Sequence, residues 1–341
     1  MNPNLTISVA IATYNRASMV QQAVQAALVQ SRAPCEVVVA DDASTDGTAA
    51  ALERLAASDA RVRLLRQTSN LGVGNWNTAI AATRGDLIAW CSDDDRFLLD
   101  HLRASAEYLE NHPDVGLVHS GFTDVVETGA SGEAAGASGK AAIGGDGGAA
   151  GSFAARPLRS AGALRVDRRN LFAYLLRYYD WPFHPSTIVM RRAVWEQTGP
   201  FDPAYALADT DWFVRAVERF PAVMLPRRGV LNRRHPGNWS NRVGSARMQA
   251  EIFAIVDRAL LRRWPDASPA RSLARAAWRA NVRLRLLLTI RARLRSGHGE
   301  AAAGAWQALA HRTGGNMWSS PERLGAALIR WSAARQSVSP L

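Results

Sequence analysis

Short apolar segments rich in β-branched residues alternate with segments of helical spacing through the first 120 residues. The apolar segments, which we expect to be strands, are residues 7–12, 36–40, 62–65, 86–91 and 115–119. The helical segments are residues 18–30, 46–57, 74–83 and 98–111. Strands that alternate with helices of about ten residues predict an α/β fold with a mostly parallel sheet flanked by helices. In such sheets ligands bind beyond the carboxyl ends of the strands, so functional residues are sought there.

Acidic side chains gather at three strand or helix ends. They are Asp41 and Asp42 after the second strand, Asp93, Asp94 and Asp95 after the fourth, and Asp209 and Asp211 at the start of a later helix. Crowded carboxylates raise one another's pKa unless a cation neutralises them. Mg²⁺ or Mn²⁺ takes one or two carboxylates and fills its other positions with phosphate oxygens and water. A solvated helix N-terminus would account for one or two of the three aspartates at 93–95. The full set favours a divalent metal site.

Four motifs in the first 120 residues share a specific order and spacing. They are ISVAIATYNR at 7–16, VVVADDASTDGT at 37–48, Asn70-Leu71-Gly72 with Asn77, and GDLIAWCSDDD at 85–95. Together they resemble the opening strand, second strand and turn, Asn-x-Gly with helix Asn, and DXD metal motif of the family 2 glycosyltransferases. Ser92 stands where many relatives have the first aspartate of the metal motif.

The resemblance implies the GT-A fold, a nucleotide-diphospho-sugar donor and inversion at the anomeric carbon. The donor-binding residues that it implies in this half of the chain are Thr13, Tyr14, Asn15, Arg16, Asp42, Asn77 and Asp93. Asp42 would contact the base and Asp94 would be the main metal ligand, with Asp93 and Asp95 at the ribose and in the metal shell. The division of labour among the three aspartates stays open. The implied cofactor is Mn²⁺ or Mg²⁺.

Inversion requires a general base, because the acceptor hydroxyl must lose its proton as it attacks. The segment Gly199-Pro200-Phe201-Asp202 precedes ADTDWFVR at 208–215, which resembles the family's base motif with Ala208 in place of the usual Glu. The match puts Asp209 at the base position, and a helix N-cap is the alternative role for this residue. Asp211 is the second candidate, or else a partner for Arg215 one helical turn further on.

The departing diphosphate also needs positive charge beside it. The segment NRRHPGNWS at 232–240 resembles a family segment that returns to the donor phosphates. Arg234 is therefore a candidate for donor binding, and His235 for metal binding or phosphate contact. A surface histidine beside a proline turn is the alternative for His235. His184 and the tryptophans Trp181, Trp212 and Trp239 are candidates for the acceptor or sugar side, although packing in the core explains such residues more often.

The expected organisation has four parts. They are a nucleotide-sugar-binding half at 1–127, a flexible Gly/Ala/Ser-rich insertion at 128–162, an acceptor-side half at 163–244, and a basic α-helical extension at 245–341. The extension carries 16 arginines and five acidic residues, which equals the whole net charge of +11. Basic amphipathic helices bind anionic membranes, so peripheral membrane association is one interpretation of Arg271 to Arg295. Packing on the catalytic body, with the arginines exposed, is the other.

These observations predict a glycosyltransferase of polysaccharide or glycoconjugate biosynthesis, with a UDP- or dTDP-sugar donor favoured and a glycan or lipid-linked acceptor. No signal peptide or membrane span is recognisable, so we expect a cytoplasmic location, with attachment to the inner membrane face through the extension. A nucleic-acid-binding protein is the alternative that the basic extension suggests. No zinc spacing or aromatic RNA-binding motif supports it, and no nucleic-acid partner is expected. A nucleotidyltransferase is a third hypothesis, although no Walker motif is present.

Overall fold

The computed structural model describes residues 4–126, 163–177, 184–235, 237–239, 245–264, 268–278 and 280. The chain divides into two compact units, Met1–Val243 and Gly244–Leu341. The predicted flexible insertion at 128–162 lies outside the described residues, and the division into four parts stays a prediction.

Within the described residues of the first unit, nine strands form one mixed sheet, in the order β3-β2-β1-β4-β8-β6-β9-β5, with β7 also paired to β9. The strands are β1 (Ile7–Thr13), β2 (Glu36–Asp41), β3 (Val62–Arg66), β4 (Leu87–Ser92), β5 (Arg96–Phe97), β6 (Leu117–Val126), β7 (Leu164–Val166), β8 (Ile188–Arg191) and β9 (Ala222–Arg234). β1 to β4 pair in parallel, as the alternation of strands and helices predicts. β8 runs antiparallel to both β4 and β6, and it joins the second half of the unit to the first.

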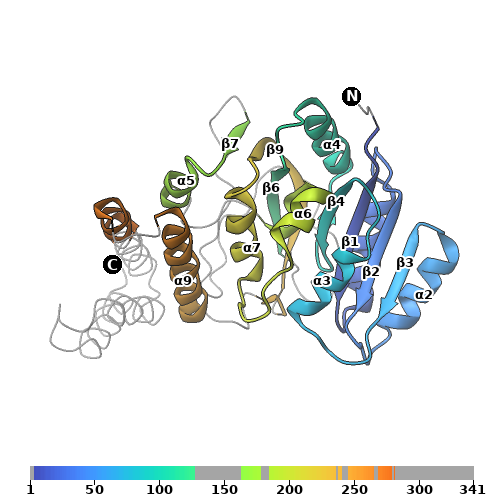
Figure 1. Cartoon of the computed structure of the whole chain (residues 1–341). Helices are drawn as coiled ribbons and strands as arrows, with labels where there is room; N and C mark the ends of the chain where they lie inside the picture. The colour runs from blue at the N-terminus through green and yellow to red at the C-terminus, as the bar shows by residue number, and fades with distance from the viewer. Residues whose placement is uncertain are drawn as a thin grey trace, which may run out of the picture. The chain divides into compact units, whose positions relative to one another are not determined.

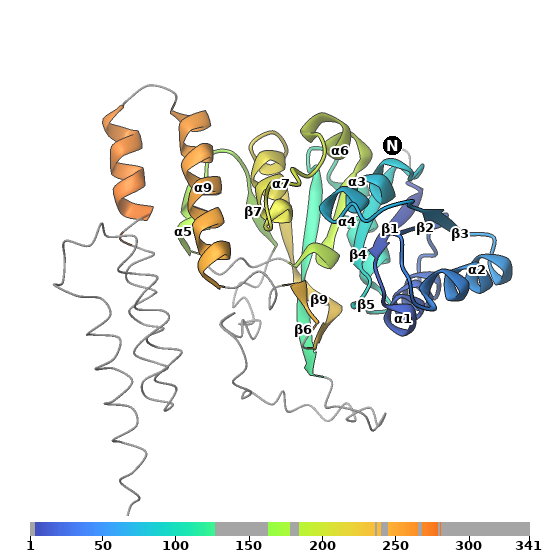
Figure 2. The ribbon, with the colours of Figure 1, turned by 90° about the horizontal axis from the view of Figure 1, so that it is seen from below.

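Helices cover both faces of this sheet. They are α1 (Ala17–Leu28), α2 (Thr48–Ser58), α3 (Val73–Ala81), α4 (His101–Asn111), α5 (Leu171–Arg177), η1 (Pro185–Thr187), α6 (Arg192–Thr198) and α7 (Ala208–Val217). The elements are labelled in Figure 1, and Figure 2 shows α1 and α2 on one face with α3, α6 and α7 on the other. Side chains alternate across a strand. Val9 and Ile11 therefore join the buried cluster that contains Val20 and Val24 of α1.

The opposite face of β4 packs on aromatic side chains. The ring of Trp90 lies 4.8 Å from that of Trp76 on α3 and 4.5 Å from that of Phe201. Phe201 in turn contacts Trp195 of α6, at 5.2 Å, and Trp212 of α7, at 5.7 Å. Trp212 is fully buried, so its place is in this core and not on a sugar. The cluster holds α7 at a set position relative to the end of β4.

The second unit is described over α9 (Ser245–Arg263) and the helical residues 269–278. The guanidinium of Arg275 donates to both carboxylate oxygens of Asp257, at 3.0 and 2.8 Å, so one of the predicted basic residues is neutralised within the unit. The arginines from Arg283 to Arg295 lie outside the described residues. Across the described ranges, each helix is too short or too polar to cross a lipid bilayer.

Candidate active site

The carboxyl ends of β1, β2 and β4 meet at one edge of the sheet. Thr13 is in register with Asp41 of β2, and Ala12 with Ser92 of β4. The residues that follow these strands are therefore neighbours, as the sequence predicts. The Thr13 hydroxyl donates to Asp93 Oδ2 at 2.8 Å, which ties the end of β1 to the acidic motif.

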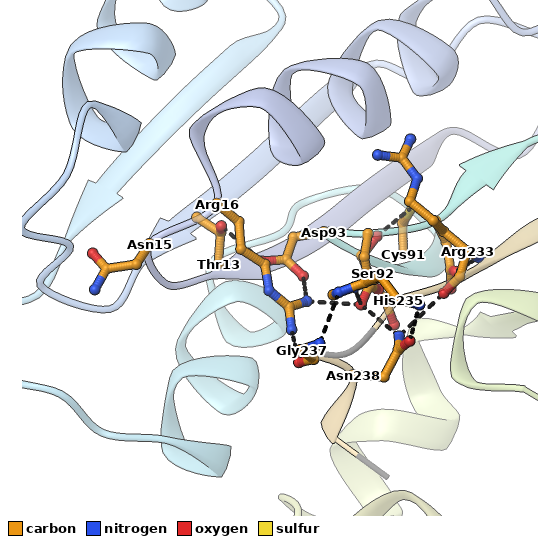
Figure 3. A network of polar contacts seen from close by, with 12 residues as sticks. Thr13, Asn15, Arg16, Cys91, Ser92, Asp93, Arg233, His235, Gly237 and Asn238 are labelled. Carbon is orange, nitrogen blue, oxygen red and sulfur yellow. Dashed lines mark hydrogen bonds and ion pairs between the residues drawn. The ribbon is translucent and has the colours of Figure 1, made fainter. Parts of the chain in front are cut away.

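One guanidinium bridges two carboxylates of this motif. The Nη1 atom of Arg16 lies 2.7 Å from Asp93 Oδ1 and 2.7 Å from Asp94 Oδ2. Burial raises the pKa of Asp93 to about 6, because the effect of Arg16, which lowers it, is smaller and the charge of Asp94 adds to the rise. Burial alone would lower the pKa of Arg16, but its two ion pairs outweigh that effect and raise it. Figure 3 shows the Arg16 side chain directed at this acidic motif.

Asp94 also contacts the segment that follows β9. Its Oδ2 atom lies 3.1 Å from His235 Nε2 and accepts a hydrogen bond from the Asn238 side chain at 3.2 Å. The backbone N–H of Gly237 donates to His235 Nδ1 at 3.2 Å. That bond makes Nδ1 an acceptor, so the proton of a neutral His235 ring sits on Nε2 and points at Asp94. The structure thus brings Arg16, Asp94 and His235 together across more than 200 positions of sequence.

Asp95 faces the second half of the unit. Its carboxylate accepts hydrogen bonds from the Ser186 hydroxyl and, at 3.3 Å, from the backbone N–H of Arg233. The Nδ1 atom of His184 lies 3.1 Å from Asp95 Oδ2, although not in hydrogen-bonding geometry. Burial raises the pKa of Asp95, and the charge of His184 opposes that rise. Asp95 therefore joins the end of β4 to η1 and β9.

The donor set suits a hard divalent cation, although the described residues include no preformed group of three His, Cys, Asp or Glu ligands. Mg²⁺ and Mn²⁺ are commonly held by one or two protein side chains plus substrate phosphates. The Asp94 oxygen and the His235 Nε2 atom are 3.1 Å apart, and both could bind one cation once the ring proton moves to Nδ1, which releases the hydrogen bond from the Gly237 N–H. Asp93 and Asp95 add negative charge on either side, so the residues fit the cofactor that the sequence predicts.

The predicted nucleoside residues lie beside this edge. Both oxygens of the buried Asp42 accept backbone N–H bonds, from Leu71 at 2.7 Å and from Gly72 at 2.9 Å. Gly72 has a φ of 57°, which favours glycine at this turn. Asp42 therefore positions the 70–72 loop, and its contact with a base stays a prediction. The ring of Tyr14 is exposed and so is open to a ligand.

Asn15 joins the loops after β1 and β2. Its backbone N–H donates to the Ser44 hydroxyl at 2.9 Å, and its side-chain oxygen accepts from the Thr45 N–H at 2.8 Å. In Figure 3 the Asn15 side chain points away from the carboxylates. Asn15 therefore lies at the outer side of the site, where a nucleoside could reach it. Its contact with the nucleoside stays a prediction.

Two predicted donor-binding residues have their polar atoms engaged inside the protein. The Asn77 amide exchanges two hydrogen bonds with the backbone of Phe201, at 3.0 and 2.8 Å. The Arg234 guanidinium donates to Asp124 on β6, at 2.9 Å. Their roles toward the donor stay predictions, and in this structure each residue links separate elements.

The two aspartates of α7 have different surroundings. The Asp211 carboxylate is buried and accepts from Arg215 Nε at 2.7 Å, and Arg215 also donates to the carbonyls of Thr198 and Pro200. Asp209 is half-buried, and its Oδ1 atom accepts from the N–H of its neighbour Thr210 at 2.8 Å. Burial raises the pKa of Asp209 against the effects of Thr210 and of the charge of His184. This arrangement favours Asp209 over Asp211 as the base, a role that stays a prediction.

Three residues that contact the site were not predicted from the sequence. Ser186, Asn238 and Asp124 bind Asp95, Asp94 and Arg234, respectively. Asn238 lay within a segment already singled out, and its Asx-type bond to the His235 N–H, at 2.6 Å, follows from the His-Pro-Gly-Asn turn. Ser186 and Asp124 carry no local signal.

A mixed α/β sheet of this order, with carboxylates at the ends of its parallel strands, defines the GT-A class that the sequence predicts. The chain is similar over 97% of its length, and 88% of the other, to S. aureus TarS 1-349 solved in complex with UDP-GlcNAc, with a TM-score of 0.60 and 16% identity. It also resembles the mannosyltransferase PcManGT from Pyrobaculum calidifontis solved with GDP-Man and Mn²⁺, over 99% of this chain and 82% of that one, with a TM-score of 0.52 and 19% identity. These likenesses confirm the fold class.

Residues 8–136 match the family model Glycosyl transferase family 2, which confirms the predicted resemblance. The chain is 39% identical over 102 residues to the succinoglycan biosynthesis protein ExoO of Rhizobium meliloti, covering 30% of this chain and 29% of that protein. The match spans about a third of the length of the curated relatives that it matches first. One of these is an uncharacterised protein of Mycobacterium tuberculosis, of whose length 37% is covered, at 33% identity over 130 residues.

Proposed function

We propose that this protein transfers a sugar from a nucleotide-diphospho-sugar to an acceptor hydroxyl, with inversion and with a divalent cation bound at the end of β4. One observation carries the proposal. The His235 Nε2 atom lies 3.1 Å from Asp94 Oδ2, beside the buried Asp93, at the sheet edge where the family 2 region holds its acidic motif. Two structural neighbours were solved with UDP-GlcNAc in one case and with GDP-Man and Mn²⁺ in the other, which supports a nucleotide sugar and a metal here.

Asp94 and His235 would hold the cation, and its bound charge would offset the negative charge that develops on the departing diphosphate. Thr13 and Asp93 fix the end of β1 against this motif. Tyr14, Asn15 and Asp42 border the side where the nucleoside would bind.

Asp209 would accept the proton of the acceptor hydroxyl. Its carboxylate has few partners and keeps lone pairs for that proton, while burial raises its pKa toward the range where a base works well near neutral pH. A base must be unprotonated to act. The transfer rate should therefore fall as the pH drops through this raised pKa.

The acceptor we propose is a glycan or a lipid-linked glycan, because one relative carries the name of succinoglycan biosynthesis and another, TuaG of Bacillus subtilis, that of teichuronic acid biosynthesis. The arginine excess of residues 245–341 supports a cytoplasmic enzyme attached to an anionic membrane face.

The proposal is tested by incubating the protein with UDP-, dTDP- and GDP-sugars, with Mn²⁺ or with EDTA, and identifying the products by mass spectrometry. We expect metal-dependent release of a free nucleoside diphosphate from at least one donor, and NMR of a transferred sugar should show the inverted anomer. Pyrophosphate as the product would indicate a nucleotidyltransferase instead. A protein that releases neither, and binds no nucleotide with Mn²⁺, would contradict the proposal.

A further inference from the structure

Arg16 is the one cationic side chain that the described structure places between Asp93 and Asp94. It directly precedes α1, and its backbone N–H donates to the Thr48 hydroxyl at 3.0 Å. Its Nη2 atom donates to the carbonyl of Gly237 at 2.8 Å, so the guanidinium spans from the acidic motif to the segment after β9 (Figure 3). The side chain is 20% exposed, and ligands from solvent can therefore reach it.

The guanidinium of Arg16 and a divalent cation would compete for the same carboxylates, those of Asp93 and Asp94. Asp94 Oδ2 already receives donors from Arg16, His235 and Asn238, at 2.7, 3.1 and 3.2 Å. A cation on this oxygen must displace at least one of them. On either oxygen of Asp94 it would lie within a few ångströms of the guanidinium, and like charges that close repel strongly where water is scarce.

We propose that Arg16 is the resident counter-ion of the site and makes the binding of the divalent cation and of the diphosphate depend on each other. This inference rests on the proposed function. A cation bound alone leaves the guanidinium facing a positive charge. A diphosphate bound alone meets the negative charge of Asp93 and Asp94, while Arg16 stays engaged with them. When both bind, the cation takes Asp94 and the guanidinium, with its planar fork of donors, takes phosphate oxygens.

The consequence is a measurable coupling, because each ligand must then raise the affinity for the other by the same factor. Arg16 supplies part of that factor. Without it, Mn²⁺ alone should bind more tightly, a nucleoside diphosphate alone should bind no better, and the gain from binding both should shrink.

The experiment is a set of calorimetric titrations of the full chain with Mn²⁺ alone, UDP alone, and Mn²⁺ at saturating UDP, with GDP used in parallel. In the wild type we expect the nucleotide to tighten Mn²⁺ binding by about tenfold or more, within the usual range of coupling between sites. In Arg16→Gln, Mn²⁺ alone should bind about tenfold more tightly, and the tightening by nucleotide should fall to about threefold or less. Arg16→Lys, which keeps the charge but loses the fork, should lie between the two.

Arg32→Gln is the matched control. Arg32 is also 20% exposed and is also paired with a carboxylate, Glu110 at 2.6 Å, away from the site. It should titrate as the wild type does, and thermal unfolding checks that each variant is folded. If Arg16→Gln does not fold, the titrations of Arg16→Lys are compared with those of the wild type instead.

Equal Mn²⁺ affinities in the wild type and in Arg16→Gln, with the nucleotide effect retained, would overturn the role of Arg16 and leave the proposed function standing. A wild-type protein that binds neither Mn²⁺ nor either nucleotide would instead overturn both.

Discussion

The carboxylates of the two acidic regions, at the end of β4 and on α7, have different hydrogen-bond partners. At the end of β4, Asp93 and Asp94 share Arg16, and Asp95 accepts from Ser186 and a backbone N–H. On α7, Asp211 is paired with Arg215, whereas the nearest donor to Asp209 is its own neighbour Thr210. The aspartates at the end of β4 and Asp211 each have a cationic or hydroxyl partner, whereas Asp209, which we propose as the base, has few donors. The surroundings of each carboxylate therefore distinguish the proposed base from the other aspartates, which the residue type alone does not do.

The largest effect should come from Asp94→Asn, which keeps the size of the side chain and removes its charge. We expect the rate of metal-dependent transfer to fall at least about 10³-fold, because a bound metal contributes several kcal/mol to the stabilisation of charge. The measurement is the release of nucleoside diphosphate with Mn²⁺ present. Asp59→Asn, at an aspartate paired with Arg61 elsewhere in the unit, is the control and should keep its activity. Full activity of Asp94→Asn in EDTA would refute the metal assignment.

The next prediction separates the proposed base from the residues that bind the metal and the nucleotide. Asp209→Asn should lower the transfer rate about 10²-fold or more, because it removes the proton acceptor. Binding of Mn²⁺ and UDP, measured by calorimetry, should stay as in the wild type. Activity within a factor of about three of the wild type would exclude Asp209 as the base, because even modest base catalysis exceeds that factor.

Asp211→Asn should show the opposite pattern. The change leaves Arg215 without its carboxylate beside the carbonyls of Thr198 and Pro200, and the free energy of unfolding should fall by about 1–3 kcal/mol. Denaturant unfolding measures this loss. The folded fraction should keep a transfer rate near that of the wild type. A stable Asp211→Asn protein without activity would instead make Asp211 the base.

The last prediction concerns a buried ionisable group away from both regions. Burial lowers the pKa of His101 to about 3, below its value of 6.5 in an unfolded chain. Between these values the unfolded state binds more protons, so the free energy of unfolding should fall as the pH drops from about 6.5 toward 3, by up to about 1.4 kcal/mol per pH unit. His101→Leu should have a shallower pH slope by that amount in denaturant unfolding. An unchanged slope would mean that His101 takes up a proton as readily in the folded protein as in the unfolded chain.

Much of the first half could be predicted from the sequence, because its signals are local. Apolar runs and helical spacing mark β1 to β4, and parallel pairing brings their carboxyl ends to one edge. The position of the antiparallel β8 between β4 and β6 depends on long-range pairing and has no such signal. That position places Ser186 beside Asp95, which explains why this contact was missed.

The hydrogen bonds of the Asn77 and Arg234 side chains also depend on long-range packing. A motif match identifies the residue type at a position, and the partner depends on which distant segment packs there. Here those partners are the backbone of Phe201 and the carboxylate of Asp124.

The aromatic cluster around Phe201 has a consequence for how rates are set. Trp90 lies three positions before Asp93, and Trp212 directly follows Asp211, so tilted aromatic rings in the interior lie between the two acidic regions. The volume of these side chains therefore sets the distance between the end of β4 and α7. We expect a smaller side chain at Phe201 to change the rate of the proposed transfer more than the affinity for the nucleotide, because the substitution alters this distance and leaves the residues proposed to bind the donor in place.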